Sequence, residues 1–181
     1  IKRLSSEVLY LNLHAIQYYW YHNPEIVTGF IDIIEKDVHT HKILAEINFY
    51  GLIVPNRADE CKRRLEKLLY LDEEEVVANL IKVCFKNFKH KEYTHLCEDY
   101  LRRFSKDGRE SVIHSYCWYA KELPVNAFDL FLDIYSCFRT NKYRDISDEL
   151  KYIKECVIIY PQECLDFIQS QNYDDNEISH F

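Results

Sequence analysis

Acidic residues at helical spacing are the first residues of this chain that could do chemistry. Asp129 and Asp133 lie four residues apart, which places both on one face of a helix. Paired carboxylates can bind a metal ion or carry out acid–base catalysis. The residues around this pair are apolar, so we interpret it as the solvent-facing stripe of an otherwise buried helix. Asp148 and Glu149 follow Ser147 directly, a pattern typical of the capped first turn of a helix.

A histidine and a cysteine form a second pair at helical spacing. His114 and Cys117 are three residues apart and could supply two zinc ligands or a thiolate activated by imidazole. Cys117 lies on the apolar side of its segment, so we interpret it as a core residue. The seven cysteines include no C-x-x-C pair, and the three glycines are isolated, which argues against a zinc ribbon and excludes a glycine-rich phosphate loop. We therefore expect no catalytic residue, metal, cofactor or small-molecule substrate in this segment.

The elements that position these residues are predicted to be helices. After Asp72 the apolar residues recur at intervals of three and four, which is the helical period. Asp72 is expected to cap that helix, and Gly51 to end an earlier one in a left-handed conformation. Three glycines and four prolines are too few for a turn-rich β fold, so the chain is predicted to be all-α, with about ten helices. The expected helices cover 4–21, 24–38, 42–50, 57–71, 73–88, 93–104, 111–122, 128–138, 147–160 and 161–171.

The prolines indicate a repeat. They stand at positions 24, 55, 124 and 161, which fits a step of about 34 residues if the long gap counts as two steps. With its short connections the chain resembles degenerate α-solenoids, including tetratricopeptide-like and clathrin-type repeats, from Pro24 to about Gln171. That resemblance implies antiparallel helical hairpins stacked as a short solenoid, and a non-catalytic scaffold or protein–protein interaction module.

A compact bundle is the alternative architecture. Small, tyrosine- and isoleucine-rich helical chains built around one apolar helix resemble the poxviral Bcl-2-like proteins, and the segment from Pro124 to Phe138 would be that helix. The N-W-G-R segment of the cellular relatives is absent. This resemblance implies a viral inhibitor of host signalling or apoptosis.

Composition bears on the location of the protein. The chain has seven cysteines, an odd number without a C-x-x-C pair, which favours a reducing, intracellular setting, either cytoplasmic or nuclear. The longest stretch without a charged residue runs from Val8 to Pro24, shorter than the ~20 apolar residues of a membrane span, so no membrane partner is expected. The chain starts at Ile1, and Asp174 looks like the capped start of a further helix. We therefore expect 1–181 to be a single domain within a longer protein.

Two aromatic clusters are the candidate protein interface. The first cluster is a run of four consecutive aromatic residues at 18–21. Four consecutive helical residues span most of a turn and cannot all face one core, so at least one of these rings is expected to be exposed or covered by a neighbour. Trp118, with His114 one turn earlier, lies off the apolar face of its segment. Exposed Trp and Tyr are typical of protein interfaces, although adjacent layers of a solenoid would also bury them. The interface candidates are Tyr18, Tyr19, Trp20, Tyr21, His114 and Trp118.

Basic residues in the middle of the chain suggest RNA as an alternative partner. If consecutive helices stack side by side, their lysines and arginines could join into a stripe suited to phosphates. Most of the arginines have an acidic residue four positions earlier, which is ordinary surface pairing. The nucleic-acid candidates are Lys62, Arg63, Lys67, Lys82, Lys86, Lys89, Arg102 and Arg103.

Overall fold

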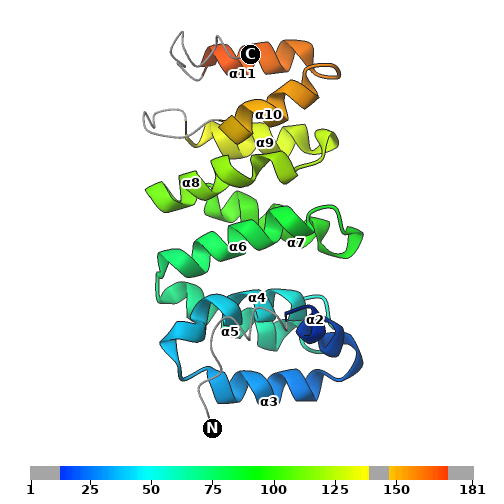
Figure 1. The fold of residues 1–181 in the computed structure, drawn as a ribbon, viewed down its shortest axis with the longest axis vertical. Coiled ribbons are helices and arrows are strands. Elements are labelled where there is room, and N and C mark those ends of the chain that lie inside the picture. The colour runs from blue at the N-terminus through cyan, green and yellow to red at the C-terminus, as the bar shows by residue number, and fades with distance from the viewer. Residues whose placement is uncertain (1–12, 139–146, 171–181) are drawn as a thin grey trace. The chain divides into compact units, whose positions relative to one another are not determined.

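The computed structural model of the chain describes residues 13–138 and 147–170 (Figure 1). Within these ranges it contains ten α-helices and no strand, which confirms the all-α prediction. The start of the helix expected at 4–21 and the expected cap at Asp174 lie outside the described residues. The chain divides into two compact units, and the boundary between Leu80 and Ile81 falls inside one helix.

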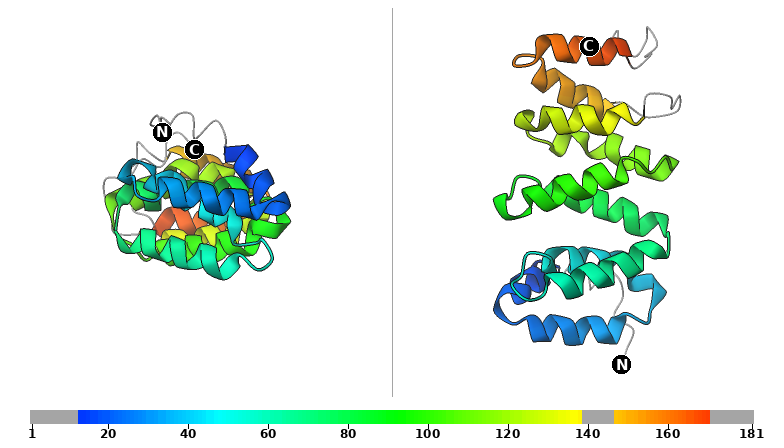
Figure 2. Two further views of the ribbon diagram at one scale, coloured as in Figure 1. Left: turned by 90° about the horizontal axis from the view of Figure 1, so that it is seen from below. Right: turned by 180° about the vertical axis from the view of Figure 1, so that it is seen from behind.

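The helices follow one another with short connections (Figure 2). The first unit contains α2 (Leu13–His22), α3 (Pro24–Ile34), α4 (His41–Gly51), α5 (Ala58–Tyr70) and the start of α6 (Glu74–Asn87). The second unit contains the rest of α6, α7 (Lys91–Phe104), α8 (Glu110–Tyr119), α9 (Phe128–Ser136), α10 (Ser147–Cys156) and α11 (Pro161–Ser170). Three short 3₁₀ helices complete them: η1 (Val38–Thr40), η2 (Ala120–Glu122) and η3 (Val125–Ala127).

Helix α4 is the centre of the first unit. It packs against α2 and α5, and every residue of α4 except Lys42 and Glu46 is buried. Gly51 does not end this helix in a left-handed conformation, as the sequence predicted, but is its last helical residue, with a negative φ. A Cβ atom at Gly51 would lie 2.3 Å from Cys61 Sγ and 3.0 Å from the Trp20 ring. Glycine is required here because α2 and α5 approach the backbone of α4 closely.

The turn between α5 and α6 also differs from the prediction. Asp72 does not cap α6, which begins at Glu74; instead Asp72 has a φ of 57° and its amide donates to the carbonyl of Leu69 at the end of α5. A left-handed residue directly after a helix is a common way to end it, and Asp tolerates that conformation better than most residues. Helix α3 likewise ends at Ile34 and not at Val38 as expected, and Val38 is the exposed first residue of η1.

Aromatic side chains form the core of the second unit. Phe131 on α9 packs between Tyr152 of α10 and Phe167 of α11, with ring centroids 4.9 and 5.1 Å apart. Asp129 and Asp133 are exposed on the same helix, which confirms their interpretation as its solvent-facing stripe. Contacting helices within this unit include α7 with α9 and α8 with α10. The stacked solenoid and the compact bundle both remain predictions.

Candidate binding surfaces

Helix α2 has a buried tryptophan and an exposed row of tyrosines. Trp20 is 1% exposed, and its indole N–H donates to the carbonyl oxygen of Ile47 on α4 at 2.8 Å. Tyr18, Tyr19 and Tyr21 are 60%, 42% and 48% exposed. The prediction that a ring of this cluster is exposed is therefore confirmed, whereas Trp20 as an interface residue was wrong. The carbonyl of Ile47 and the space above Gly51 decide which of the four aromatic residues turns inward.

The exposed tyrosines lie on one short helix, and with His22 they make up what we call the tyrosine surface, defined as Tyr18, Tyr19, Tyr21 and His22. The Tyr18 and His22 rings lie 4.2 Å apart, and Tyr18 meets Tyr19 edge to face at 5.8 Å. No Lys, Arg, Asp or Glu occurs in α2. Protein interfaces are enriched in aromatic residues and their centres are depleted of charge, and the tyrosine surface has both properties.

A second exposed aromatic group lies on α8 in the second unit. Trp118 is 51% exposed, and the His114 ring stacks beside it with centroids 6.1 Å apart and planes 21° apart. The Lys121 ammonium lies 5.6 Å from the ring centroid, within cation–π range. Cys117 is buried and its thiol faces Glu149 Oε2 at 3.8 Å, which confirms it as a core residue.

A buried carboxylate holds two lysines next to Trp118. Asp148 Oδ2 accepts a hydrogen bond from Lys121, and Oδ1 accepts one from Lys151, both at 2.7 Å. Burial alone would raise the pKa of Asp148, but the hydrogen bonds from the two lysines outweigh it and hold that pKa below its ordinary value. Asp148 thus stays charged and fixes both ammonium groups at the surface.

The basic residues predicted to bind nucleic acid are divided between the two units. Lys62, Arg63 and Lys67 are on α5 in the first unit. In the second unit Lys82 and Lys86 are on α6, Arg102 and Arg103 are on α7, and Lys89 lies in the turn between these helices. Lys67 pairs with Glu35 at 3.0 Å, and Arg102 pairs with Asp133. In these two ion pairs an acidic side chain balances the charge of a basic residue that was predicted to bind nucleic acid.

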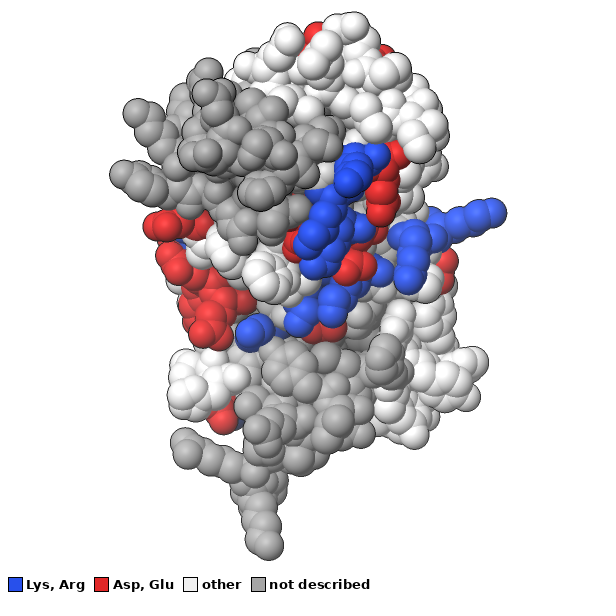
Figure 3. Space-filling model, turned by 45° about the horizontal axis from the view of Figure 1, so that its top comes forward, with Lys and Arg blue, Asp and Glu red and all other residues white. Residues whose placement is uncertain are grey.

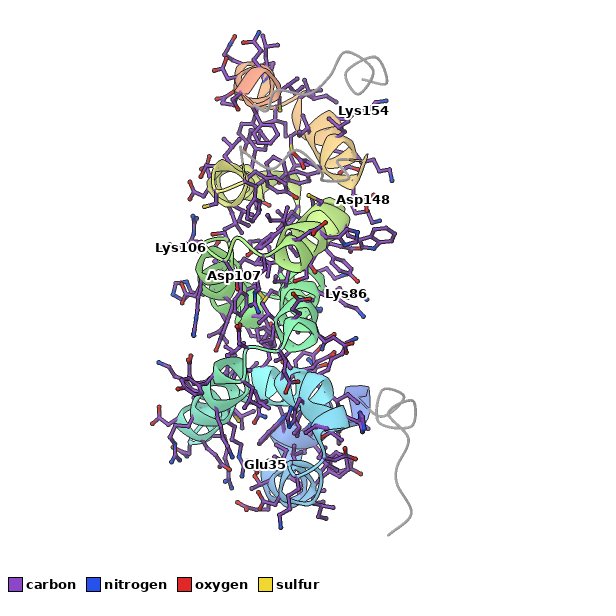
Figure 4. The ribbon with its side chains drawn as sticks, turned by 90° about the vertical axis from the view of Figure 1, so that its left-hand side faces the viewer. Glu35, Lys86, Lys106, Asp107, Asp148 and Lys154 are labelled. Atoms are coloured by element: carbon purple, nitrogen blue, oxygen red, sulfur yellow. The ribbon has the colours of Figure 1, made fainter. Side chains whose placement is uncertain are left out.

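The structure adds Lys121, Lys151 and Lys154, which were not singled out from the sequence, to Lys86, which was a nucleic-acid candidate. Lys86, Asp148 and Lys154 lie on one side of the second unit, and Lys106 and Asp107 lie on the other (Figure 4). Lys121 lies beside Asp148 on the first of these sides, because its ammonium group donates a hydrogen bond to the Asp148 carboxylate. In the sequence, the only sign that a lysine lies beside Trp118 is the position of Lys121 three residues after it. Lys151 and Lys154 gave no such sign, because they belong to a helix more than thirty residues further along the chain.

An ion-pair network in the first unit ties α3 to α5. Arg64 donates to Asp32 at 2.8 Å and to Glu35 at 2.9 Å, both on or just after α3, and to Glu60 on its own helix at 3.1 Å. The hydrogen bond from Lys67, together with its charge and that of Arg64, lowers the pKa of Glu35. All five charged residues are thus engaged with one another, and the network has a structural role.

A small pocket opens beside this network. Its volume is about 50 Å³, and its apolar walls come from Ile31, Leu44, Leu68 and Leu71. Asn48 also lines it; its amide group donates to Leu44 while its Oδ1 has no hydrogen-bond partner within the described part of the chain. The pocket has room for one small apolar group.

Most of the cysteines are buried thiols. Burial raises the pKa of Cys61 to about 12 and that of Cys164 to about 11, so neither is a thiolate at neutral pH. Cys137 is exposed.

In the described ranges no group of three His, Cys, Asp or Glu residues is placed to hold a metal ion, and no helix there has the length and apolar character to cross a membrane.

Comparison with known proteins adds no relative. No protein-family model, no curated protein and no solved structure matches this chain.

Proposed function

We propose that this chain is a non-catalytic protein-interaction module that binds another protein through the tyrosine surface of α2. One observation carries the proposal: three tyrosines on a helix without a charged residue are each more than 40% exposed. A tyrosine ring contributes apolar contact area, and its hydroxyl can form a hydrogen bond at the edge of an interface. Truncation of such residues commonly removes a large share of binding energy.

The helix that carries these tyrosines is held firmly by its other face. Trp20 is buried and hydrogen-bonded to α4, and α2 packs against both α3 and α4. A surface on a fixed helix loses little conformational entropy when it binds, and this supports binding without rearrangement of the module.

The test compares the double variant Tyr18→Ala/Tyr21→Ala with Tyr70→Ala. Tyr70 is a single tyrosine, 89% exposed, on α5 of the same unit, and is therefore a matched control. Proteins captured from an extract of the source cells are quantified by mass spectrometry. A specific partner is expected to fall about tenfold or more with the double variant and to be unchanged with Tyr70→Ala.

The fold of each variant is checked by far-ultraviolet circular dichroism and thermal unfolding. The proposal is wrong if the folded double variant captures the same proteins in the same amounts as the wild type.

A further inference from the structure

We infer that the second unit has a separate binding site for an acidic protein segment, centred on Trp118. We call it the Trp118 face and define it as Lys86, His114, Trp118, Lys121, Lys151 and Lys154. All six residues are exposed. The inference goes beyond the proposed function and does not depend on the tyrosine surface, which belongs to the first unit.

The Trp118 face has an excess of positive charge. Asp148 is a single carboxylate shared by Lys121 and Lys151, so one of the two positive charges is not balanced by it. The side chains of these lysines are 41% and 65% exposed, and their ammonium groups can therefore reach a ligand. Lys86 and Lys154 lie on the same side of the unit (Figure 4).

The sign of this charge is opposite to that of the whole chain. The protein carries a formal net charge of −7, which repels an acidic partner from most of its surface. Lysine and arginine side chains gather in one run on the face drawn in Figure 3, with acidic side chains among them. Asp148, Glu122 next to Lys121 and Glu155 next to Lys154 offset three of the four lysine charges, which leaves a small positive excess on this face. Electrostatic complementarity therefore directs an acidic segment to this face.

The aromatic group favours a protein segment over a nucleic acid. Nucleobases bind by stacking on a free aromatic face. The Trp118 ring has His114 beside it from the preceding turn and the Lys121 ammonium over it from the following turn. The Trp118 side chain is half exposed and suits contact with an apolar side chain. The occupant is thus a segment in which Asp or Glu residues flank an apolar residue.

The experiment measures fluorescence anisotropy of three labelled probes with the whole chain, at 50 and 200 mM salt. The probes are a 16-residue peptide with glutamates around a central Leu-Leu, the same peptide with glutamines, and a 15-nucleotide oligouridine. We expect the glutamate peptide to bind, and its Kd to rise several-fold at the higher salt because screening weakens charge pairs. The glutamine peptide should bind at least tenfold more weakly.

Two variants test the residues of the Trp118 face, and a third matches the change in charge of the double lysine variant. Trp118→Ala and Lys86→Glu/Lys154→Glu are each expected to weaken the glutamate peptide about tenfold. Neither lysine of that pair contacts Asp148, so its hydrogen bonds are retained. Lys36→Glu/Lys62→Glu alters the net charge equally on exposed positions of the first unit, and should change the Kd less than twofold.

Four results would overturn the inference. These are no binding of the glutamate peptide at 50 mM salt, equal binding of the glutamine peptide, an equal loss in the control variant, and tighter binding of oligouridine that the Trp118-face variants abolish. The last result would identify a nucleic-acid site. Tyr18→Ala/Tyr21→Ala should leave peptide binding unchanged, so failure here and failure of the proposed function are distinguishable.

Discussion

Replacement of Gly51 by alanine tests the packing of the first unit directly. Alanine is favoured over glycine by about 1 kcal/mol in a helix interior, so at the last residue of α4 propensity alone predicts a gain in stability of at most about that size. The added Cβ, however, would lie 2.3 Å from Cys61 Sγ and 3.0 Å from the Trp20 ring. Both side chains are at most 1% exposed, and the Trp20 indole is hydrogen-bonded to Ile47, so neither can move aside easily.

We expect an overpacking cost near the upper end of its usual range, about 3 kcal/mol. After the gain in propensity, Gly51→Ala should lower the free energy of unfolding by about 2 kcal/mol, which corresponds to a Tm lower by about 4–8 °C. Gly29→Ala is the matched control, because Gly29 is an exposed glycine inside α3 with no atom within 4 Å of an added Cβ. It should raise the Tm by about 1–4 °C.

Circular dichroism at 222 nm during heating measures both variants. Adding Cys61→Ala to Gly51→Ala removes the closest contact, so the two changes should be coupled favourably by about 1 kcal/mol in a double-mutant cycle. The reasoning is refuted if Gly51→Ala raises the Tm as Gly29→Ala does.

Three further predictions concern charge, thiols and the backbone. The folded-state pKa of Asp148 is below its ordinary value of 3.8. The stabilising contribution of Asp148 is therefore complete above pH 3.8 and is lost as the pH falls through the folded-state pKa. Asp148→Asn should flatten the pH dependence of the free energy of unfolding, measured in urea, below about pH 4. In the folded protein Ellman's reagent should react rapidly at Cys137, and Cys137→Ser should remove this fast phase, whereas rapid reaction of Cys61 would contradict its burial. Asn56 has a φ of 62°, so Asn56→Ala should destabilise by about 1 kcal/mol, while Asn56→Gly should be nearly neutral; equal Tm values for the two variants would refute the backbone argument.

The helices could be predicted from the sequence because the period of the apolar residues is a local property. The stripe after Asp72 and the exposed pair Asp129 and Asp133 follow from which positions share a helix face. The low glycine and proline content likewise excluded a turn-rich β fold without reference to any contact. Core packing of Cys117 was also predictable, because its neighbours on the helix are apolar.

The candidate sites were only partly predictable. The exposed tyrosines and Trp118 were found in the sequence, but Trp20 was assigned to the interface although it is buried. Lys121, Lys151 and Lys154 were missed, because residues from η2 and α10 meet only after folding. The role of Gly51 was mistaken for the same reason: the atoms that require glycine there belong to α2 and α5.

The sequence by itself determined that this protein is helical and which side chains share each helix face. Only the tertiary structure decided which face is covered and which is open to a partner. The physical reason is that helical periodicity depends on residues three and four apart, whereas burial depends on groups distant in the chain. The Ile47 carbonyl takes the Trp20 indole and leaves three tyrosines outside, and the buried Asp148 carboxylate fixes two lysines beside Trp118.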